Sequence, residues 1–538
     1  MEDLEIAQQT KLAPLKEIAA KLGLSEEQIS YYGKTKAKIE VPYQAVNQPD
    51  GKLILVTSIN PTPLGEGKTT MSIGIHDALC KLGYQSVVVL REPSLGPVFG
   101  IKGGATGGGK SQVVPMEEIN LHFTGDIHAI TACNNLLCAA IDNHIFQGND
   151  LDLDPDQIFF HRCLDINDRA LRTVEVGRDC KNARIDHFAI SVASEIMAIL
   201  CLADSLSDLK RRLSQILIGY NRSGAPVYVA DLKVEGALTI LLKEAIKPNL
   251  VQTLEHNPAI IHGGPFANIA HGCNSLVATK LGLKLADYVV TEAGFGSDLG
   301  GEKFMDIKCR IGNLKPDAVV VNATIRSMKY NGDGSFEAGV KNLLVHVTNM
   351  QKYSNHVLVC LNHFATDTKE ELAFIKTICQ QQGVACYISS SHQLGSDGAL
   401  ALAQALVDIC QKPSEFNLLY EDDLNIRAKI RTVAQEIYRV KEVIYEEGVC
   451  EKITALEQLG YQKLPVCIAK TPYSLADDPK KRGYHPQATV TVRDVKVCSG
   501  AGFIVVYMGN VMTMPGLSKD PSMLHMDITK DGVIQGLF

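Results

Sequence analysis

The 538-residue sequence lacks several features that would place it in a particular class. It contains no tryptophan, and its fifteen cysteines form no C-x-x-C pair, which disfavours a cysteine-rich zinc site and favours reduced thiols in the cytoplasm. The acidic N-terminus has no apolar signal segment, and the longest apolar stretch, residues 188–203, is too short and too polar to span a bilayer. A net charge of −7 disfavours a broad nucleic-acid surface. We therefore expect a cytoplasmic protein without membrane or nucleic-acid partners.

The most informative stretch of the chain is residues 52–70, KLILVTSINPTPLGEGKTT. Its apolar first half predicts a buried parallel strand, and a helix is predicted from residue 69 to residue 82. Between them, Gly65 and Gly67 let the backbone approach an anion, while Lys68 adds a positive charge at the start of the helix. The pattern matches the phosphate-loop motif G-x-x-x-x-G-K-[ST] except at its first glycine, where Thr62 stands. We predict a phosphate site here rather than an ordinary glycine-rich turn.

Polar and aromatic side chains follow other predicted strands, at the edge where open α/β sheets bind their ligands. Arg91 is placed to clamp a phosphate or carboxylate, although a structural salt bridge is an alternative role. Glu292 stands where magnesium is commonly held. His262, Phe364 and His392 end three further strands, and a ring such as Phe364 either stacks a flat heterocycle or belongs to the core. Together these positions predict an ATP-using enzyme with a second, organic substrate.

The alternation of strands and helices between residues 50 and 410 predicts an α/β fold. We expect a doubly wound, mostly parallel sheet of the phosphate-loop NTPase type, with additional α/β lobes. The predicted units are a nucleotide-binding part of the main domain (1–150), a helical added lobe (151–225), a continuation of the parallel sheet with the second substrate's site (226–410) and a C-terminal α+β lobe (411–538).

Six segments of the chain resemble motifs of the formate–tetrahydrofolate ligase family. They are NPTPLGEGKTT, REPSLGPVFGIKGGATGGGKSQVVPMEEINLHFTGD, IHGGPFANIAHGCNS, TEAGFGSDLGGEKFMDIKCR, NHFATDT and TMPGL, in the family's order. The resemblance covers essentially the whole chain, whose length is similar to that of monofunctional members. It implies that formate, MgATP and tetrahydrofolate give 10-formyltetrahydrofolate, ADP and phosphate through a formyl phosphate intermediate, with the formate and folate site in residues 226–410.

The resemblance also implies roles for three candidate catalytic residues. Lys68 would contact the β- and γ-phosphate oxygens, Arg91 would clamp formyl phosphate, and His262 lies in the family's His-Gly-Gly motif near the transfer site. The residues expected to bind ATP are Thr62, Pro63, Leu64, Gly65, Glu66, Gly67, Lys68 and Thr69.

Metal and folate positions follow from the same resemblance. Thr69 would lie near Mg²⁺, and Glu92 and Asp126 match positions linked to a monovalent cation, ammonium or potassium. Phe364 matches one wall of the pterin slot. His392 stands where the family often has a tryptophan as the other wall, and its smaller ring predicts weaker folate binding.

The resemblance also implies the quaternary structure. Because the family is homotetrameric, we expect a homotetramer whose partners are its small-molecule substrates. The family's PGLPK turn carries Ser518 here, which changes the local turn chemistry. The alternative is a phosphate-loop ATPase that acts as a conformational switch or delivery protein without formyl transfer. Its marks, a second lysine in the loop or a cysteine pair for metal, are not evident in the sequence.

Overall fold

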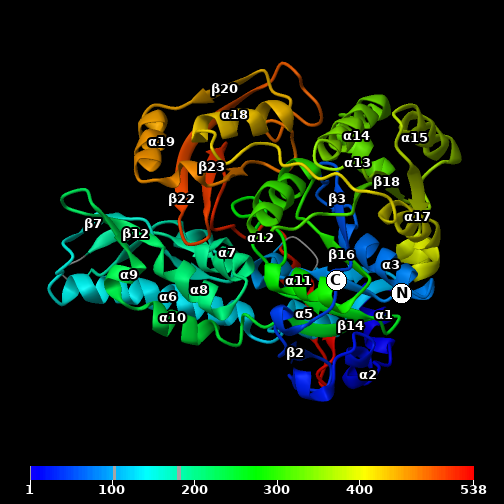
Figure 1. The fold of residues 1–538 in the computed structure, drawn as a ribbon, viewed down its shortest axis with the longest axis horizontal. Helices are drawn as coiled ribbons and strands as arrows, with labels where there is room; N and C mark the ends of the chain where they lie inside the picture. Colours follow the sequence, from blue (N-terminus) through cyan, green and yellow to red (C-terminus); the bar gives the residue numbers. More distant parts are fainter. Residues whose placement is uncertain (1, 101–104, 179–182, 538) are drawn as a thin grey trace.

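The computed structural model describes residues 2–100, 105–178 and 183–537 (Figure 1). Within these residues the largest sheet has twelve strands, and the six neighbouring pairs from β15 to β19 all run parallel. In spatial order, these strands are β15 (Pro258–Ile261), β4 (Ser86–Leu90), β16 (Tyr288–Glu292), β3 (Lys52–Ser58), β17 (Ala318–Ala323), β18 (Val357–Asn362) and β19 (Cys386–Ser389). The large, mostly parallel sheet predicted from the sequence is therefore confirmed.

Both faces of this sheet are covered, which explains the nearly continuous apolar runs of its strands. Along β3, Leu53 and Leu55 join one apolar cluster while Ile54 and Val56 join another, because successive side chains point to opposite faces. The helices that cover one face include α3 (Lys68–Lys81) and α17 (Leu400–Cys410), and those that cover the other include α11 (Leu276–Leu285) and α14 (Phe336–Gln351).

The strand and helix predicted around the phosphate loop are present within a residue or two of the expected bounds. The helix begins at Lys68 and ends at Lys81, followed by Gly83 with a φ of +92°. The amide of Tyr84 donates to the carbonyl of Leu79 across this turn, so the glycine allows the last turn of the helix to be capped.

Residues 151–225, for which the sequence predicts a helical lobe, contain strands as well as helices. Two short strands, β8 (Arg162–Leu164) and β11 (Phe188–Ile190), pair in parallel. The larger strands and the helices of this segment are β7 (Leu153–Ile158), β12 (Leu217–Asn221), α7 (Glu195–Leu202) and α8 (Leu206–Ser214). In Figure 1 the segment lies to one side of the main sheet, beneath the C-terminal strands.

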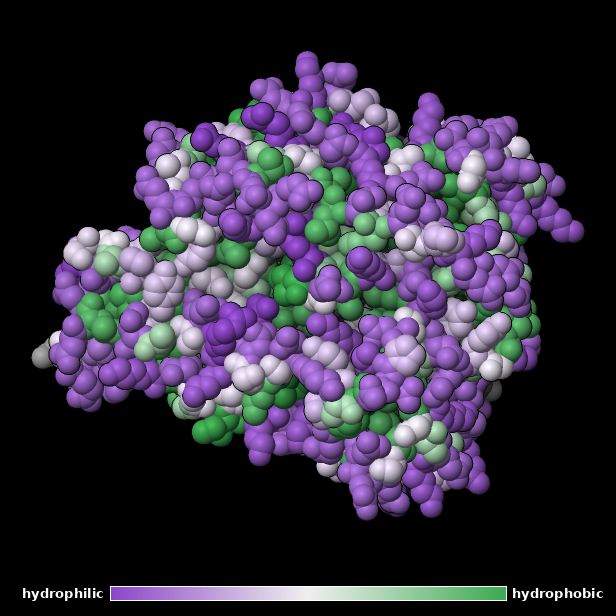
Figure 2. Space-filling model, in the orientation of Figure 1, coloured by the Kyte–Doolittle hydropathy of each residue, from purple (hydrophilic) through white to green (hydrophobic). Residues whose placement is uncertain are grey.

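The C-terminal residues form a second, smaller sheet flanked by two helices. Its order is β20-β22-β23-β21, and β22 and β23 are the one antiparallel pair among these described strands. The elements are α18 (Ile426–Glu436), β20 (Glu442–Tyr445), α19 (Val449–Gln458), β21 (Val466–Ala469), β22 (Thr489–Cys498) and β23 (Phe503–Met508). Within the described residues, no helix combines the length and the apolar character needed to cross a bilayer. Figure 2 shows a mostly hydrophilic face, with apolar residues most evident in the hollow near its centre.

A buried carboxyl group joins the phosphate-loop helix to the neighbouring part of the sheet. Asp77 of α3 is fully buried, and its Oδ1 accepts hydrogen bonds from the Thr253 hydroxyl at 2.7 Å and the Asn257 side-chain amide at 2.8 Å. Burial raises the pKa of Asp77 from 3.8 to about 7. The folded protein therefore keeps a proton that the unfolded chain releases above about pH 4.

We expect Asp77→Asn to remove this pH dependence. Because the raised pKa means that the folded state binds more protons than the unfolded state between about pH 4 and pH 7, the stability contributed by the protonated carboxyl falls as the pH rises through that window. Between about pH 4 and pH 7, the free energy of unfolding of the variant should therefore rise relative to that of the wild type by up to about 4 kcal/mol. Urea unfolding at several pH values measures the difference, and Asp156→Asn, at an exposed position on β7, is the control. A difference that does not change with pH would contradict the assignment.

Candidate active site

The phosphate loop depends on two glycines in left-handed backbone conformations. Gly65 has a φ of +79° and Gly67, which caps α3, has a φ of +68°. A Cβ atom at Gly67 would lie 2.7 Å from the side-chain nitrogen of Asn362, so a larger residue has neither the conformation nor the space. The loop thus brings the amides at the start of α3, and the side chain of Lys68, to the carboxyl end of β3. There the Lys68 ammonium donates to the Ser58 hydroxyl at 3.3 Å.

Glu66 anchors this loop to the protein. It is 2% exposed, and its carboxylate accepts hydrogen bonds from the Thr62 amide at 2.8 Å and the Thr324 hydroxyl at 2.7 Å. Its carbonyl accepts from the side-chain amide of Asn322 at 2.7 Å. The Glu66 side chain therefore faces into the protein and shapes the loop.

The remaining loop side chains face in different directions. Leu64 is 78% exposed at the tip, so its side chain points to solvent. The Thr62 hydroxyl is buried and has no hydrogen-bond partner. An unsatisfied buried hydroxyl at the edge of a phosphate loop fits a polar ligand.

Charged side chains from two other strands meet the loop. The Thr69 hydroxyl donates to Oε2 of Glu292 at 3.0 Å, and Nη2 of Arg91 lies 3.9 Å from Oε1 of the same carboxylate. Glu292 ends β16 and Arg91 follows β4, so the order of the parallel strands places both beside the loop. Nε of Arg91 is buried without a hydrogen-bond partner. The expected convergence of Lys68, Thr69, Arg91 and Glu292 is thus present in the structure.

His262 is engaged by the protein at both ring nitrogens. Nδ1 lies 2.6 Å from the Ser275 hydroxyl and Nε2 lies 2.6 Å from the carbonyl oxygen of Ala245. Because a carbonyl only accepts, Nε2 carries the proton and Nδ1 accepts from Ser275. Burial lowers the pKa of His262 to about 4, so the ring is neutral at pH 7. By contrast, both ring nitrogens of the buried His271 lack hydrogen-bond partners.

Glu92 and Asp126 have different surroundings. Both oxygens of Asp126 accept from the buried Lys38 ammonium, at 2.6 and 2.7 Å, and Oδ2 also accepts from Asn249 at 2.8 Å. Glu92 is 5% exposed, and its Oε2 has no hydrogen-bond partner. Burial, and then the charge of Asp126, raise the pKa of Glu92 well above its usual range. Of the two carboxyl groups, Glu92 is therefore the one with a buried oxygen that accepts no hydrogen bond.

The two aromatic positions at the other end of the sheet have separate partners. The Arg326 guanidinium lies 5.3 Å from the ring centre of Phe364, and its Nη2 donates to the Gly65 carbonyl at 2.9 Å. Nε2 of His392 lies 3.6 Å from Oδ1 of Asp3, whose carboxylate raises the pKa of the histidine. Among the described residues, no ring contact joins Phe364 to His392.

A protein-family model for formate–tetrahydrofolate ligase matches residues 1–538, the whole chain. The chain belongs to this family. It is an ATP-dependent ligase that joins formate to tetrahydrofolate and yields 10-formyltetrahydrofolate. ATP and tetrahydrofolate are its substrates, and Mg²⁺ is the usual companion of ATP. The alternative of a switching ATPase has no support in this match.

The family's turn near the C-terminus is held from the 151–225 segment. The guanidinium of Arg169 donates to the carbonyl of Leu517, and a Cβ atom at Gly516 would lie 2.7 Å from this guanidinium. The hydroxyl of Ser518, the departure from the ligase pattern, is buried without a hydrogen-bond partner.

Sequence reasoning missed several residues that shape this ligase site. Asn322 is the next-to-last residue of β17 and Asn362 is the last residue of β18. Like Glu292, they are polar residues at the carboxyl ends of parallel strands, and this position in the sequence could have identified them. Arg326 lies in the first turn of the following helix, α13 (Ile325–Asn331), where only its contacts identify it. Lys38 lies 88 residues from Asp126, and no local pattern pairs them.

The segment that directly follows β4 and carries Arg91 and Glu92 is packed against Gly264. A Cβ atom at Gly264 would lie 2.2 Å from the Glu92 carbonyl oxygen, a backbone atom that cannot move without the strand. We expect Gly264→Ala to displace Arg91, to lower kcat/KM of the ligase reaction and to reduce the free energy of unfolding by about 1–3 kcal/mol.

Gly236→Ala is the matched control. It lies in the helix α10 (Glu235–Leu242) with nothing within 4 Å of its added Cβ, and it should be neutral or stabilising by up to about 1 kcal/mol. Initial rates and urea unfolding measure both variants. Equal activity of the two proteins would show that the contact at Gly264 does not position Arg91.

Proposed function

We propose that Thr62 to Thr69 hold the phosphates of ATP and that Arg91 presents the transferred phosphoryl group to formate. The observation that carries this proposal is the convergence of Lys68, Thr69, Arg91 and Glu292 at the ends of three neighbouring parallel strands. Phosphoryl transfer needs positioned cations more than covalent help from the protein, and this set supplies an ammonium, a guanidinium and the amides of a helix start.

The reaction then proceeds in two displacements. A formate oxygen attacks the γ-phosphorus, the bond to the bridging oxygen breaks, and ADP leaves. The product, formyl phosphate, is an anion that the Arg91 guanidinium pairs with. N10 of tetrahydrofolate next attacks the formyl carbon, inorganic phosphate departs, and N10 loses its proton. Arg91 is about three-quarters buried, with its side chain 23% exposed, which favours pairing with an anion over pairing with water.

Thr69 and Glu292 are the residues that would hold Mg²⁺. Both offer oxygen atoms, which are the donors that Mg²⁺ prefers, and their oxygens are already adjacent at 3.0 Å. When bound, the ion neutralises charge on the phosphate oxygens. The residues themselves fix the start of α3 against the end of β16.

A monovalent cation, ammonium or potassium, fits Glu92 better than Asp126. Glu92 has a buried oxygen without a hydrogen bond, whereas the two oxygens of Asp126 already accept three hydrogen bonds from Lys38 and Asn249. A cation beside Glu92 would favour its ionised form. We assign Asp126 to the electrostatic surroundings of this site.

We assign Phe364 and His392 to the two sides of the pterin slot, and His262 to a positioning role. The neutral ring of His262, bonded to Ser275 and Ala245, holds the start of α11 beside the end of β15. Arg326 links the proposed slot to the phosphate loop, because it contacts both Phe364 and Gly65.

The larger-scale assignments rest on the strand order and on the family. The parallel order with helices on both faces supports a doubly wound sheet of the phosphate-loop NTPase type, with units at 1–150, 151–225, 226–410 and 411–538. We also propose a homotetramer and a cytoplasmic location. Size-exclusion chromatography with light scattering tests the first of these.

Loss of the positive charge of either Lys68 or Arg91 should abolish the ligase reaction. Lys68→Ala and Arg91→Ala are expected to lower kcat by at least about 100-fold, because each removes a charge that stabilises the transferring phosphoryl group. The assay incubates protein with formate, MgATP and tetrahydrofolate, then acidifies and measures the absorbance of methenyltetrahydrofolate. Arg178→Ala, whose side chain is 79% exposed, is the control. Turnover near the wild-type value in both site variants would refute their roles without touching the family assignment.

Arg326 gives a separate test of the proposed folate slot. Arg326→Ala should raise the KM for tetrahydrofolate about fivefold, since a cation–π contact is worth roughly 1 kcal/mol, and it should also raise the KM for ATP. Arg326→Lys should restore only part of the loss, because lysine lacks the planar group. Lys329→Ala on the same helix, whose partner is Glu371, is the control. An unchanged folate KM in Arg326→Ala would remove Phe364 from the slot.

A further inference from the structure

Two histidines and an aspartate come together in the 151–225 segment, on elements separate from the phosphate loop. His161 directly precedes β8 and His187 directly precedes β11. The register of this parallel pair aligns Phe188 with Arg162, so the two histidines occupy matching positions on neighbouring strands. Asp186 is the residue before His187. One donor atom from each of the three side chains lies within 4.8 Å of the others.

The two imidazole rings stack at close range. The rings of His161 and His187 lie 3.7 Å apart between centres with a tilt of 37°. Oδ1 of Asp186 accepts from Nδ1 of His161 at 2.7 Å, while Oδ2 is buried and has no hydrogen-bond partner. Asp186 is 6% exposed, so this orphan oxygen is out of reach of bulk water. A buried carboxylate oxygen beside two imidazoles is the kind of unsatisfied group that a bound ion would explain.

The neighbouring cations are mostly engaged elsewhere. Arg162 and Arg184 form ion pairs with Oδ2 of Asp186 at 3.6 and 3.8 Å, while their hydrogen bonds go to Asp142. The ammonium of Lys496 donates to the carbonyl of Phe159. Oδ2 of Asp186 therefore has ion pairs but accepts no hydrogen bond, and its lone pairs can serve a further ligand.

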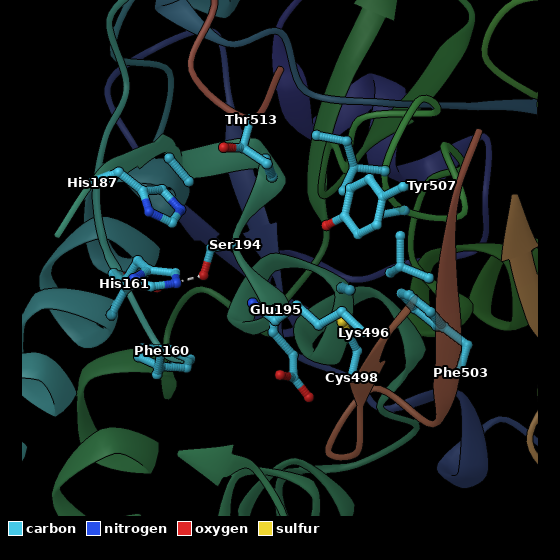
Figure 3. A pocket seen from close by; sticks show the side chains of 17 residues that line it. Phe160, His161, His187, Ser194, Glu195, Lys496, Cys498, Phe503, Tyr507 and Thr513 are labelled. Atoms are coloured by element: carbon cyan, nitrogen blue, oxygen red, sulfur yellow. Dashed lines mark hydrogen bonds between the residues drawn. The ribbon is translucent and has the colours of Figure 1, made fainter. Parts of the chain in front are cut away.

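A small cavity of about 60 Å³ adjoins the two rings. Figure 3 shows His161 and His187 on one wall, with Tyr507 and Phe503 of β23 on the opposite wall. Ser194 and Thr513 also line the cavity. The space is large enough for water molecules, which commonly complete the coordination of a metal held by three protein ligands.

We propose that His161, Asp186 and His187 bind one divalent transition-metal ion of the zinc class. Two imidazoles and one carboxylate form a donor set that suits Zn²⁺, Co²⁺ or Fe²⁺ rather than Mg²⁺ or Ca²⁺. Binding through Nδ1 of His161 displaces the proton that now lies between this nitrogen and Asp186. This proton moves to Nε2, so the imidazole ligand stays neutral. The ion ties β8 to β11 at the contact with the C-terminal sheet, so its role is structural and distinct from the ligase reaction.

The test uses the full-length protein after removal of metals with a chelator. Titration with Co²⁺ should give a d–d absorption band that saturates at one ion per chain, and Zn²⁺ should abolish the band by displacing Co²⁺. His187→Ala and Asp186→Asn should each weaken binding by about 100-fold. His525→Ala, which removes a histidine from an exposed His–Asp pair, should bind like the wild type.

Thermal unfolding provides a second readout that does not need activity. Zn²⁺ should raise the melting temperature of the wild type and of His525→Ala but not that of His187→Ala or Asp186→Asn. Circular dichroism identifies any variant that fails to fold. If one of the two site variants does not fold, the comparison with the wild type is made with the other. The proposal is overturned if the wild type binds no stoichiometric Co²⁺ or Zn²⁺, or if the folded site variants bind these ions as tightly as the wild type.

Discussion

The arrangement of the active site depends on the hydrogen bonds of the buried Glu66. Its carbonyl joins the phosphate loop to the carboxyl end of β17, and its carboxylate joins the loop to the start of α13. A loop with two left-handed glycines has many alternative conformations in the unfolded chain, and these bonds select one of them. Because the loop is fixed to neighbouring strands, its amides and the side chain of Lys68 stand at a set distance from Arg91 and Glu292. The electrostatic pairing of the site therefore depends on a buried side chain that faces the interior of the protein.

The parallel strands and the helix that follows the phosphate loop could be predicted from the sequence. Apolar runs of strand length identified the parallel strands, because a strand buried on both faces cannot carry polar residues in its middle. The same runs located Arg91 and Glu292, since the first polar residues after such a strand lie at the ligand-binding edge. The helix of the phosphate loop was predicted within one residue at each end, because the glycines before and after it mark its limits.

Other features depend on contacts between distant residues and could not be predicted in this way. Glu66 is predicted to bind ATP because it lies in the loop motif. The inward direction of its side chain is set by Thr324, 258 residues away, and the loop pattern does not show this contact. Lys38 and Asp126 form a buried pair that no local pattern indicates. The three-residue strands β8 and β11 are too short to show a period, so the segment was predicted to be helical. Their pairing also brings His161 next to His187, which the wide spacing of these residues in the sequence conceals.

His392, which we propose as one wall of the pterin slot, contacts a distant part of the chain. A histidine provides less stacking area than a tryptophan, but its ring nitrogens can bind an acid. Here the acid is Asp3 of α1 (Asp3–Gln9), whose carboxylate also accepts from the Gly109 amide at 2.8 Å. The carbonyl of Asp3 accepts from Gln112 at 3.0 Å, so the helix is held to strand β6 (Ser111–Val114) on the same side of the sheet. The contact with Asp3 therefore orients the smaller ring from the N-terminal helix. A ring oriented before binding would lose less entropy if a ligand stacked on it.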